Sequence, residues 1–408
     1  MLLVRQLPPP VERAYVARML QPFAEALSEL GLEQEIRILS VPSGYPSPKL
    51  VNLVLRRVGG LTFQFEASAS RPEVIAANRQ LLQDNSVKKL DALLVTHCHG
   101  DHAGSAGLIS GFGRPAGERA PIYLHSAAFR SLTHPTPTFL HETYEIFLSR
   151  CHWGLREYNS LSDEEMIENA LRKRFSGYFT QTPKRALHFV DHGEVPDGIL
   201  AVPTPGHSQD CVMYFDAALG VAVPGDTIIC TGKPEHPETW HFVIPIFTVG
   251  GQSYSMAYER YLRTIRHLRM FFSRHRVRAV LPPHGRFAVT EPMGWVRFAE
   301  RYFEGIYQAF LNEFLADTSR GPREQPFRAC DLNPYIPSAG AHPVSTPSHV
   351  FGMLCTLADE GYLNLEEDIH TRQIHFQVLE TPPESYVRDL LSADPGPVPL
   401  FHAGASLG

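Results

Sequence analysis

Residues 93–104, LLVTHCHGDHAG, place three histidines and one aspartate within six positions, directly after a short apolar run. Imidazole and carboxylate groups are suitable ligands for zinc, iron and manganese. In an extended loop, side chains two positions apart point the same way, so His97 and His99 can converge on one ion. Asp101 and His102 follow where the loop turns into a helix, and they can approach a second ion. The pattern predicts a metal site that needs further ligands from elsewhere in the chain.

Three further candidate ligands occur later in the chain: His207 in PTPGHSQD, Asp226 in AVPGDTII and His284 in AVLPPHGR. Each follows an apolar, strand-like run and lies at a turn, where layered α/β folds gather their site residues. Five histidines and two aspartates suit two divalent ions that share one bridging carboxylate. Zinc is the favoured metal, and iron and manganese remain alternatives because ligand type alone does not separate them.

The elements that must position these residues alternate between strands and helices. Apolar spacing predicts an N-terminal helix over 11–31, a helix over 72–84 and another near 254–273. The pair Gly59–Gly60 reads as a hairpin turn between two β-type runs. The predicted strands lie within EIRILSV, LVNLVLRRVGGLTFQFEAS, DALLVTH, APIYLHS, RALHFVDHGEVPDGILAVPTPGHS, CVMYFDAALGVAVPGDT and VRAVLPPHG.

Four segments follow from this pattern. We expect an N-terminal helical extension over 1–34, a catalytic domain over 35–290, a C-terminal helical and winged-helix-like domain over 291–385, and a disordered tail over 386–408. The catalytic domain contains a helical insertion at about 136–180. In the C-terminal domain, helices are predicted over 291–316 and 344–361, followed by a β-hairpin in YLNLEEDIHTRQIHFQVLE.

Composition narrows the class of protein. The chain has 408 residues, of which 43% are hydrophobic and 20% charged, as in ordinary globular proteins. A net charge of −6 provides no overall basic field for nucleic acid or anionic membranes. The six cysteines form no C-x-x-C pair, so we expect mostly buried thiols in a reducing compartment. Without a signal-peptide pattern or a long apolar span, the expected location is cytoplasmic and no membrane span is predicted.

The ordered motifs THCHGDH, TPGHS, PGDT and PPHG resemble the metallo-β-lactamase superfamily, and within it the glyoxalase II-like hydrolases, over about residues 35–290. The resemblance implies a four-layer αββα sandwich, classed here as α+β, with the metal site at one edge of the two sheets. It also implies that His97, His99 and His207 bind one metal. Asp101, His102 and His284 would bind the other metal, and Asp226 would bridge both.

Three positions refine the resemblance. The family usually carries Asp in a D-x-G after its early strands, where it supports the histidine loop; this chain has FQFEASAS, so Glu66 is expected to substitute. The true β-lactamases usually have cysteine where Asp226 stands, which speaks against lactam hydrolysis. Flavodiiron enzymes carry Glu at the position of His99, which argues against that branch.

The predicted activity is metal-dependent hydrolysis by a hydroxide that bridges the two metals, with Asp101 as a candidate proton shuttle. The insertion would form a lid with an apolar lining, and the apolar segment 239–251 would lie near the mouth of the site; the alternative is that both segments pack on the core or on a second subunit. We therefore expect a thioester or ester substrate with an extended apolar acyl part, either a small molecule or carrier-bound. The candidate lid residues are Phe139, Tyr144, Phe147 and Trp153.

Two other functions stay open. The segment STPSHVFGMLCTLADEGYLNLEED resembles the C-terminal module of lactamase-like endoribonucleases, which makes single-strand RNA cleavage the second hypothesis. Its candidate recognition helix, 346–361, has no Lys or Arg, so nucleic acid is a disfavoured partner without being excluded. The third hypothesis is a non-haem iron oxygenase on the same fold, because the same ligands can hold iron. A homodimer is the default oligomeric state.

Overall fold

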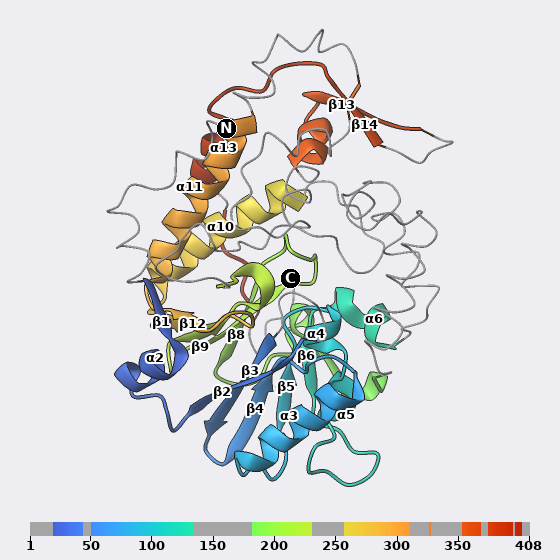
Figure 1. The fold of residues 1–408 in the computed structure, drawn as a ribbon, viewed down its shortest axis with the longest axis vertical. Coiled ribbons are helices and arrows are strands. Elements are labelled where there is room, and N and C mark those ends of the chain that lie inside the picture. The colour runs from blue at the N-terminus through green and yellow to red at the C-terminus, as the bar shows by residue number, and fades with distance from the viewer. Residues whose placement is uncertain are drawn as a thin grey trace.

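The computed structural model describes residues 19–43, 50–133, 182–230, 257–310, 326–327, 353–368, 374–394 and 396–401. Two six-stranded mixed sheets form its centre (Figure 1). In spatial order, the first sheet contains β2 (Ile36–Pro42), β3 (Leu50–Val58), β4 (Leu61–Phe65), β5 (Ala92–Leu94), β6 (Ile122–Leu124) and β7 (Leu187–Phe189). The second contains β1 (Leu20–Pro22), β12 (Phe287–Val289), β11 (Ala279–Val280), β10 (Val221–Val223), β9 (Val212–Asp216) and β8 (Ile199–Pro203).

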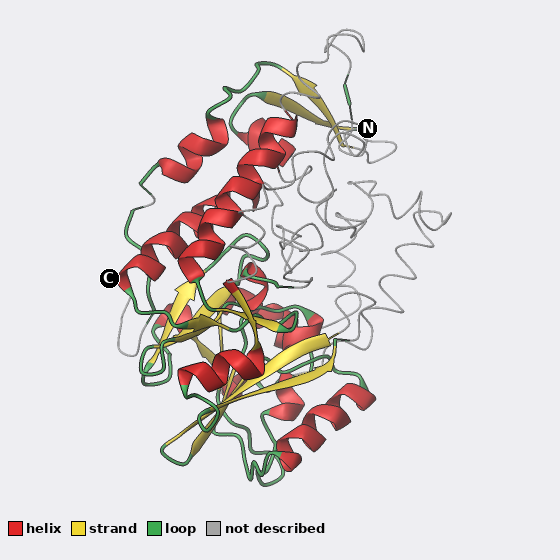
Figure 2. Ribbon diagram, turned by 60° about the vertical axis from the view of Figure 1, so that its left-hand side comes forward, coloured by secondary structure: helices red, strands yellow, loops and turns green. Residues whose placement is uncertain are grey.

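Helices lie on the outer side of each sheet (Figure 2). Those that follow first-sheet strands are α3 (Pro72–Asp84), α4 (Gly100–Ala103), α5 (Ala106–Ile109) and α6 (Phe129–Thr133). By contrast, α2 (Phe23–Leu30), which follows β1, adds Ala26 and Leu27 to the core cluster between the sheets. The second sheet is covered by α10 (Ala257–Arg274), α11 (Pro292–Phe310) and α13 (Tyr386–Ser392), whose apolar residues share one core cluster with its strands. No helix within the described ranges is long and apolar enough to cross a membrane.

Strand β3 shows why the layers form. Its odd-numbered residues Val51, Leu53 and Leu55 join a core cluster that includes Val74 and Leu82 of α3. Side chains alternate along a strand, so the even-numbered residues face the other way. Val54 accordingly belongs to the cluster between the two sheets, with Tyr214 of β9 and Val223 of β10. The layer order is thus helix, sheet, sheet, helix, as expected for a sandwich of this kind.

The direction of the strands fixes where the loops meet. In the second sheet, β8 and β10 both run antiparallel to β9, and β10 runs parallel to β11. The carboxyl ends of β8, β10 and β11 therefore lie at one edge. In the first sheet, the pairs β4–β5, β5–β6 and β6–β7 are parallel. These parallel pairs, with helices between β4, β5 and β6 in the sequence, make the fold α/β rather than the predicted α+β class.

The predicted N-terminal helix over 11–31 is interrupted within its described part. Residue 19 is helical, but residues 20–22 form β1, which pairs with β12, and α2 begins at Phe23. Pro22 has no N–H group to donate within a helix, which explains the break before α2. The segment expected to be a helical extension therefore also supplies an edge strand of the second sheet.

The expected disorder of residues 386–408 is wrong for the described part. Residues 386–392 form α13, in which Tyr386, Val387 and Leu391 are buried. Arg269 of α10 donates to the Leu391 carbonyl (2.9 Å), and Phe401 exchanges backbone hydrogen bonds with Ala201 of β8 (2.8 and 2.9 Å). These contacts are distant in sequence, so composition alone does not reveal them.

The predicted hairpin of the winged-helix-like domain is present as β13 (Leu363–Glu367) and β14 (Ile374–Val378). Residues 353–359 are helical, within the predicted helix over 344–361. The hairpin residues Leu363 and Phe376 belong to the core cluster that covers the second sheet. The predicted helix residues 311–316 and 344–352 lie outside the described residues.

Candidate metal centre

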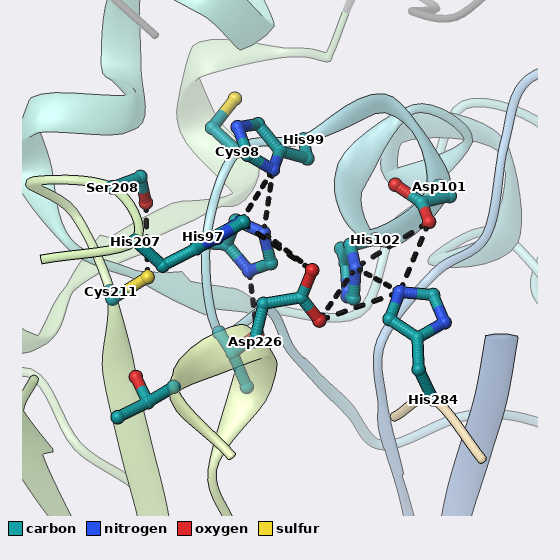
Figure 3. A network of polar contacts seen from close by, with 12 residues as sticks. His97, Cys98, His99, Asp101, His102, His207, Ser208, Cys211, Asp226 and His284 are labelled. Atoms are coloured by element: carbon teal, nitrogen blue, oxygen red, sulfur yellow. Dashed lines mark hydrogen bonds and ion pairs between the residues drawn. The ribbon is translucent and has the colours of Figure 1, made fainter. Parts of the chain in front are cut away.

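The structure brings all seven candidate ligands to one edge of the two sheets (Figure 3). His97 and His99 follow β5, and Asp101 and His102 lie in α4, the short helix that comes next. The other three come from the second sheet. His207 follows β8, Asp226 lies in the 3-10 turn η6 (Gly225–Thr227) after β10, and His284 follows β11.

The first ligand group consists of His97, His99, His207 and Asp226. Nδ1 of His99 lies 3.0 Å from Nε2 of His97 and 2.9 Å from Nε2 of His207. Oδ2 of Asp226 lies 3.4 Å from the same His207 nitrogen and 3.9 Å from that of His97. Ligand atoms about 3.3 Å apart are expected around a tetrahedral ion with bonds of about 2.0–2.1 Å. These four side chains therefore fit one metal ion.

The second ligand group consists of Asp101, His102 and His284. Nε2 of His284 lies 3.2 Å from Nε2 of His102 and 3.3 Å from Oδ2 of Asp101. Asp226 completes this group with its other oxygen, because Oδ1 lies 3.4 Å from both histidine Nε2 atoms. That oxygen is buried and accepts no hydrogen bond from any residue in the described ranges. A buried carboxylate oxygen without a hydrogen bond is costly unless a cation lies beside it, so this group also fits a metal.

The histidines of the first group are held neutral. Burial lowers the pKa of His207 to about 3 and that of His97 well below its ordinary range. Burial likewise lowers the pKa of His99, although it alone of the seven is only partly buried. Neutral imidazole is the form that binds metal, so these rings offer their lone pairs at neutral pH.

The second group has the opposite tendency. Burial alone would lower the pKa of His102, but the carboxylates of Asp101 and Asp226 outweigh it and raise the pKa well above its ordinary range. The same two carboxylates overcome burial at His284 and raise its pKa. In return, His284 and His102 hold the pKa of Asp226 well below its usual range despite burial. Without metal, this group favours protonated rings beside ionised carboxylates.

Hydrogen bonds to the far nitrogens fix two ring orientations. The Thr96 hydroxyl donates to Oε1 of Glu66 (2.5 Å), so it must accept from Nδ1 of His97 (3.1 Å). The Nδ1–H of His284 donates to the backbone carbonyl of Leu50 (2.7 Å). In the neutral form of both rings, Nε2 directs its lone pair into the ligand group, which is the usual arrangement of metal-binding histidines.

Two glycines let the ligand loops approach their supports closely. Gly225, with φ of 57°, lies against Thr96, and a Cβ there would come 2.5 Å from the Thr96 hydroxyl oxygen. Gly206, with φ of 146°, lies against Tyr261 of α10, where a Cβ would meet the Tyr261 Cβ at 2.7 Å. The glycines before Asp226 and His207 are therefore required by both conformation and space.

Sequence reasoning missed Asp210. Its Oδ2 accepts the backbone N–H of Cys98 (2.7 Å) and its Oδ1 accepts the Ser208 hydroxyl (2.6 Å), so one buried carboxylate ties the two histidine loops of the first group together. Asp210 is the last residue of PTPGHSQD, and an acidic residue three positions after a candidate ligand was the available signal, whereas its burial is visible only in the structure.

Comparison with known proteins agrees with this geometry. Residues 75–271 match the family model of the metallo-beta-lactamase superfamily. Over those residues the chain is similar to that superfamily. A search of curated proteins found no match.

Two solved structures show that the superfamily fold extends over most of the chain. One is a metallo-beta-lactamase family protein from Thermus thermophilus, with 18% identity, a TM-score of 0.57 and coverage of 85% of this chain and 99% of its own. The other is a beta-lactamase domain protein from Burkholderia ambifaria, with 16% identity, a TM-score of 0.55 and coverage of 85% and 94%. At these identities the likeness concerns the fold alone.

Glu66 lies where the metallo-beta-lactamase domain was expected to carry a supporting carboxylate. The residue is fully buried and adopts a positive φ of 66° directly after β4. Besides accepting from Thr96, its Oε1 lies 3.3 Å from Nδ1 of His102. Glu66 therefore contacts both ligand groups, reaching His97 through Thr96 and His102 directly.

Of the other predicted features of the domain, Cys98 is described by the structure and the lid segments are not. Cys98 is buried among apolar residues that include Ala128, and Figure 3 shows its side chain pointing away from the rings, as expected for a packed thiol. The insertion 136–180 and the segment 239–251 lie outside the described residues. With them lie the candidate lid residues Phe139, Tyr144, Phe147 and Trp153.

Proposed function

We propose that the protein is a dinuclear metal-dependent hydrolase that acts on a carboxylic thioester or ester with an extended apolar acyl part. The observation that carries the proposal is the position of Asp226, which presents Oδ2 to the first ligand group and Oδ1 to the second. One carboxylate shared between two sets of imidazoles would hold two ions close together. Zinc is the proposed metal, and iron or manganese suit the same ligand types.

When bound, two divalent ions supply Lewis acidity and a nucleophile of hydroxide character at neutral pH. Two buried thiols among the described residues do not compete with this chemistry. Cys98, Cys211 and Cys230 are buried, and burial raises the pKa of Cys230 to about 12 and that of Cys211 well above its ordinary range. Neither of these two thiols is a thiolate at neutral pH, so they are unsuited to covalent catalysis.

Asp101 is proposed to carry a proton toward the leaving group. Although burial would raise its pKa, His102 and His284 lower it, so the carboxylate is ionised and able to accept a proton. Only one of its oxygens contacts the two histidines, as Figure 3 shows. The other oxygen is the proposed site of proton transfer.

The substrate is proposed to approach from the side of His99, the one candidate ligand that is partly exposed. Aspartate at position 226, rather than the cysteine usual in lactam-hydrolysing relatives, favours an ester or thioester over a lactam. The apolar stretches expected beside the site favour an extended acyl group, free or bound to a carrier.

RNA cleavage, the second hypothesis, is disfavoured by burial. In the helix 353–359, residues Met353 to Leu357 are almost entirely buried. All of them except Thr356 belong to the core cluster that covers the second sheet. A helix that reads nucleic acid must expose side chains to a groove or a phosphate backbone. This helix therefore packs against the protein rather than presenting a recognition surface.

The test begins with metal content, measured by mass spectrometry on protein purified without added metal. It is followed by hydrolysis of acyl thioesters and p-nitrophenyl esters of increasing chain length, with a lactam and a single-stranded RNA in the same panel. Two zinc ions per chain and a kcat/KM that rises with acyl length would support the proposal. Iron with oxygen consumption would replace it with the oxygenase, RNA cleavage would replace it with the nuclease, and no bound metal would overturn the metal centre.

A further inference from the structure

Strand β3 reaches the second ligand group from across the gap between the sheets. Asn52 stands on the same face of β3 as Val54, which packs between the sheets, and is 1% exposed. Directly opposite lies the turn 282–285, which carries His284 after β11. A polar residue in this apolar position needs hydrogen-bond partners, because an unpaired buried amide costs about 1–3 kcal/mol.

Asn52 finds its hydrogen-bond partners in the turn 282–285 and in β2. Its amide Nδ2 donates to the carbonyls of Gly285 (2.9 Å) and Pro282 (3.2 Å), on either side of His284. Its backbone N–H donates to the carbonyl of Pro283 (2.6 Å). On the other side, the hydroxyl of Ser40 donates to Oδ1 (2.7 Å). All the partners of the Nδ2 group are carbonyls, which only accept, so the orientation of the amide is fixed.

The turn needs such support because of its own sequence. Pro282 and Pro283 have no N–H groups, so this stretch cannot form a regular ladder with a neighbouring strand. Its carbonyls instead receive the donors of Asn52. Two residues earlier on β3, the Leu50 carbonyl accepts the Nδ1–H of His284. The ring of His284 and the backbone on both sides of it are thus held by one short segment of the opposite sheet.

We propose that Asn52 is the positioning residue of the second metal site, setting the place of His284 without touching the metal. This rests on the two-metal part of the proposed function. Asparagine suits the role because its amide offers two donors toward the turn and one acceptor toward Ser40. Aspartate has nearly the same shape but offers only acceptors, and it would face the Pro282 and Gly285 carbonyls with a negative charge.

The test compares stepwise zinc binding to the metal-free full-length wild type, N52D and N52A by titration calorimetry, with cobalt absorption spectra as a second probe. Loss of a group that orients a metal ligand typically weakens metal binding by about 10–100-fold. We expect N52D to keep the first zinc within about threefold and to weaken the second by that larger factor. N52A keeps the backbone bond to Pro283 and avoids the added charge, so it tests the same point if N52D does not fold.

The matched control is Asn85→Asp, which removes a similar amide-to-carbonyl bond (Asn85 to Leu81, 2.8 Å) at the end of α3. It is expected to lower the melting temperature of the metal-free protein without changing either zinc affinity. Equal affinities in N52D, N52A and wild type would overturn the role of Asn52, and so would equal weakening of both zinc ions. A wild type that binds fewer than two zinc ions would instead overturn the two-metal centre itself, so the two failures are distinguishable.

Discussion

The two ligand groups share Asp226 but differ in electrostatics. In the first group, burial lowers the pKa values of three histidines that are close to one another, so the rings are neutral. In the second, Asp101 and Asp226 outweigh burial and raise the pKa values of His102 and His284. A metal entering the first group meets free lone pairs, whereas one entering the second must displace protons. Neighbouring sites with similar ligands can thus differ in the order and pH dependence of metal loading.

The groups also differ in their supports. The first is braced by Asp210, which ties two ligand loops together, and by α10, where Tyr261 donates to the Thr227 carbonyl (2.7 Å) beside Asp226. The second is braced by β3, through Leu50 and Asn52. Glu66 supports both groups, His102 directly and His97 through Thr96. Substitutions at these residues would distinguish a support shared by both groups from a support of one group.

The largest effect is expected for Asp226→Ala. It removes the carboxylate whose two oxygens each serve one ligand group. We expect metal content to fall from two ions to less than one, and hydrolysis to fall by about a thousandfold or more, since metal-based charge stabilisation is worth several kcal/mol. Metal analysis and kcat/KM measure this, with the exposed carboxylate variant Asp197→Ala as control. Retention of one ion at full occupancy would show that Asp226 belongs to a single group.

Next comes Glu66→Gln, which keeps the size of the side chain but removes its charge. Because Glu66 contacts Thr96 and His102, we expect both zinc affinities to fall, each by about 10–100-fold. Stepwise zinc titration measures the two losses separately. Glu66→Asp restores the carboxylate usual in the family on a shorter stem and should recover part of the affinity. Loss at one group alone would contradict the shared role.

The contrast between ligands and supports explains what the sequence could predict. The seven candidate ligands stand in short motifs, each at the end of an apolar run beside glycine or proline, so residue type and position were both visible. Asn52 and Thr96 are single polar residues next to apolar runs, and their function depends on how two sheets face each other. Likewise, α13 packs on α10, a contact between segments more than a hundred residues apart that local periodicity does not encode.

In the metal-free protein, the two groups should change the free energy of unfolding in opposite directions as pH rises. His207 has a folded pKa of about 3, below the ordinary value of 6.5, so its stabilising effect is present above pH 6.5 and is lost as pH falls toward 3. From pH 7 to pH 5 the loss is about 2 kcal/mol. His102 has a raised folded pKa, so its contribution is present below pH 6.5 and is lost as pH rises through that raised value.

Urea unfolding with a chelator, across pH 5 to 8, measures both contributions. We expect His207→Asn to flatten the acid side of the stability profile and His102→Asn to flatten the alkaline side. The two variants serve as controls for each other, because each removes a buried imidazole from the same edge of the sheets. Parallel profiles for wild type and both variants would show that the two groups do not differ in protonation.

The smallest effect on metal binding is expected for substitutions of Asp210. This residue positions ligand loops of the first group, as Asn52 is proposed to position His284 in the second. Asp210→Ala removes the acceptors for Cys98 N–H and the Ser208 hydroxyl, and we expect the first zinc to bind about tenfold more weakly with the second unchanged. Asp210→Asn keeps an acceptor for Cys98, and the Ser208 hydroxyl can rotate to accept from the new amide. Near-normal binding in Asp210→Asn would therefore show that hydrogen bonding positions these loops, whereas equal losses in both variants would assign the effect to the negative charge beside His99.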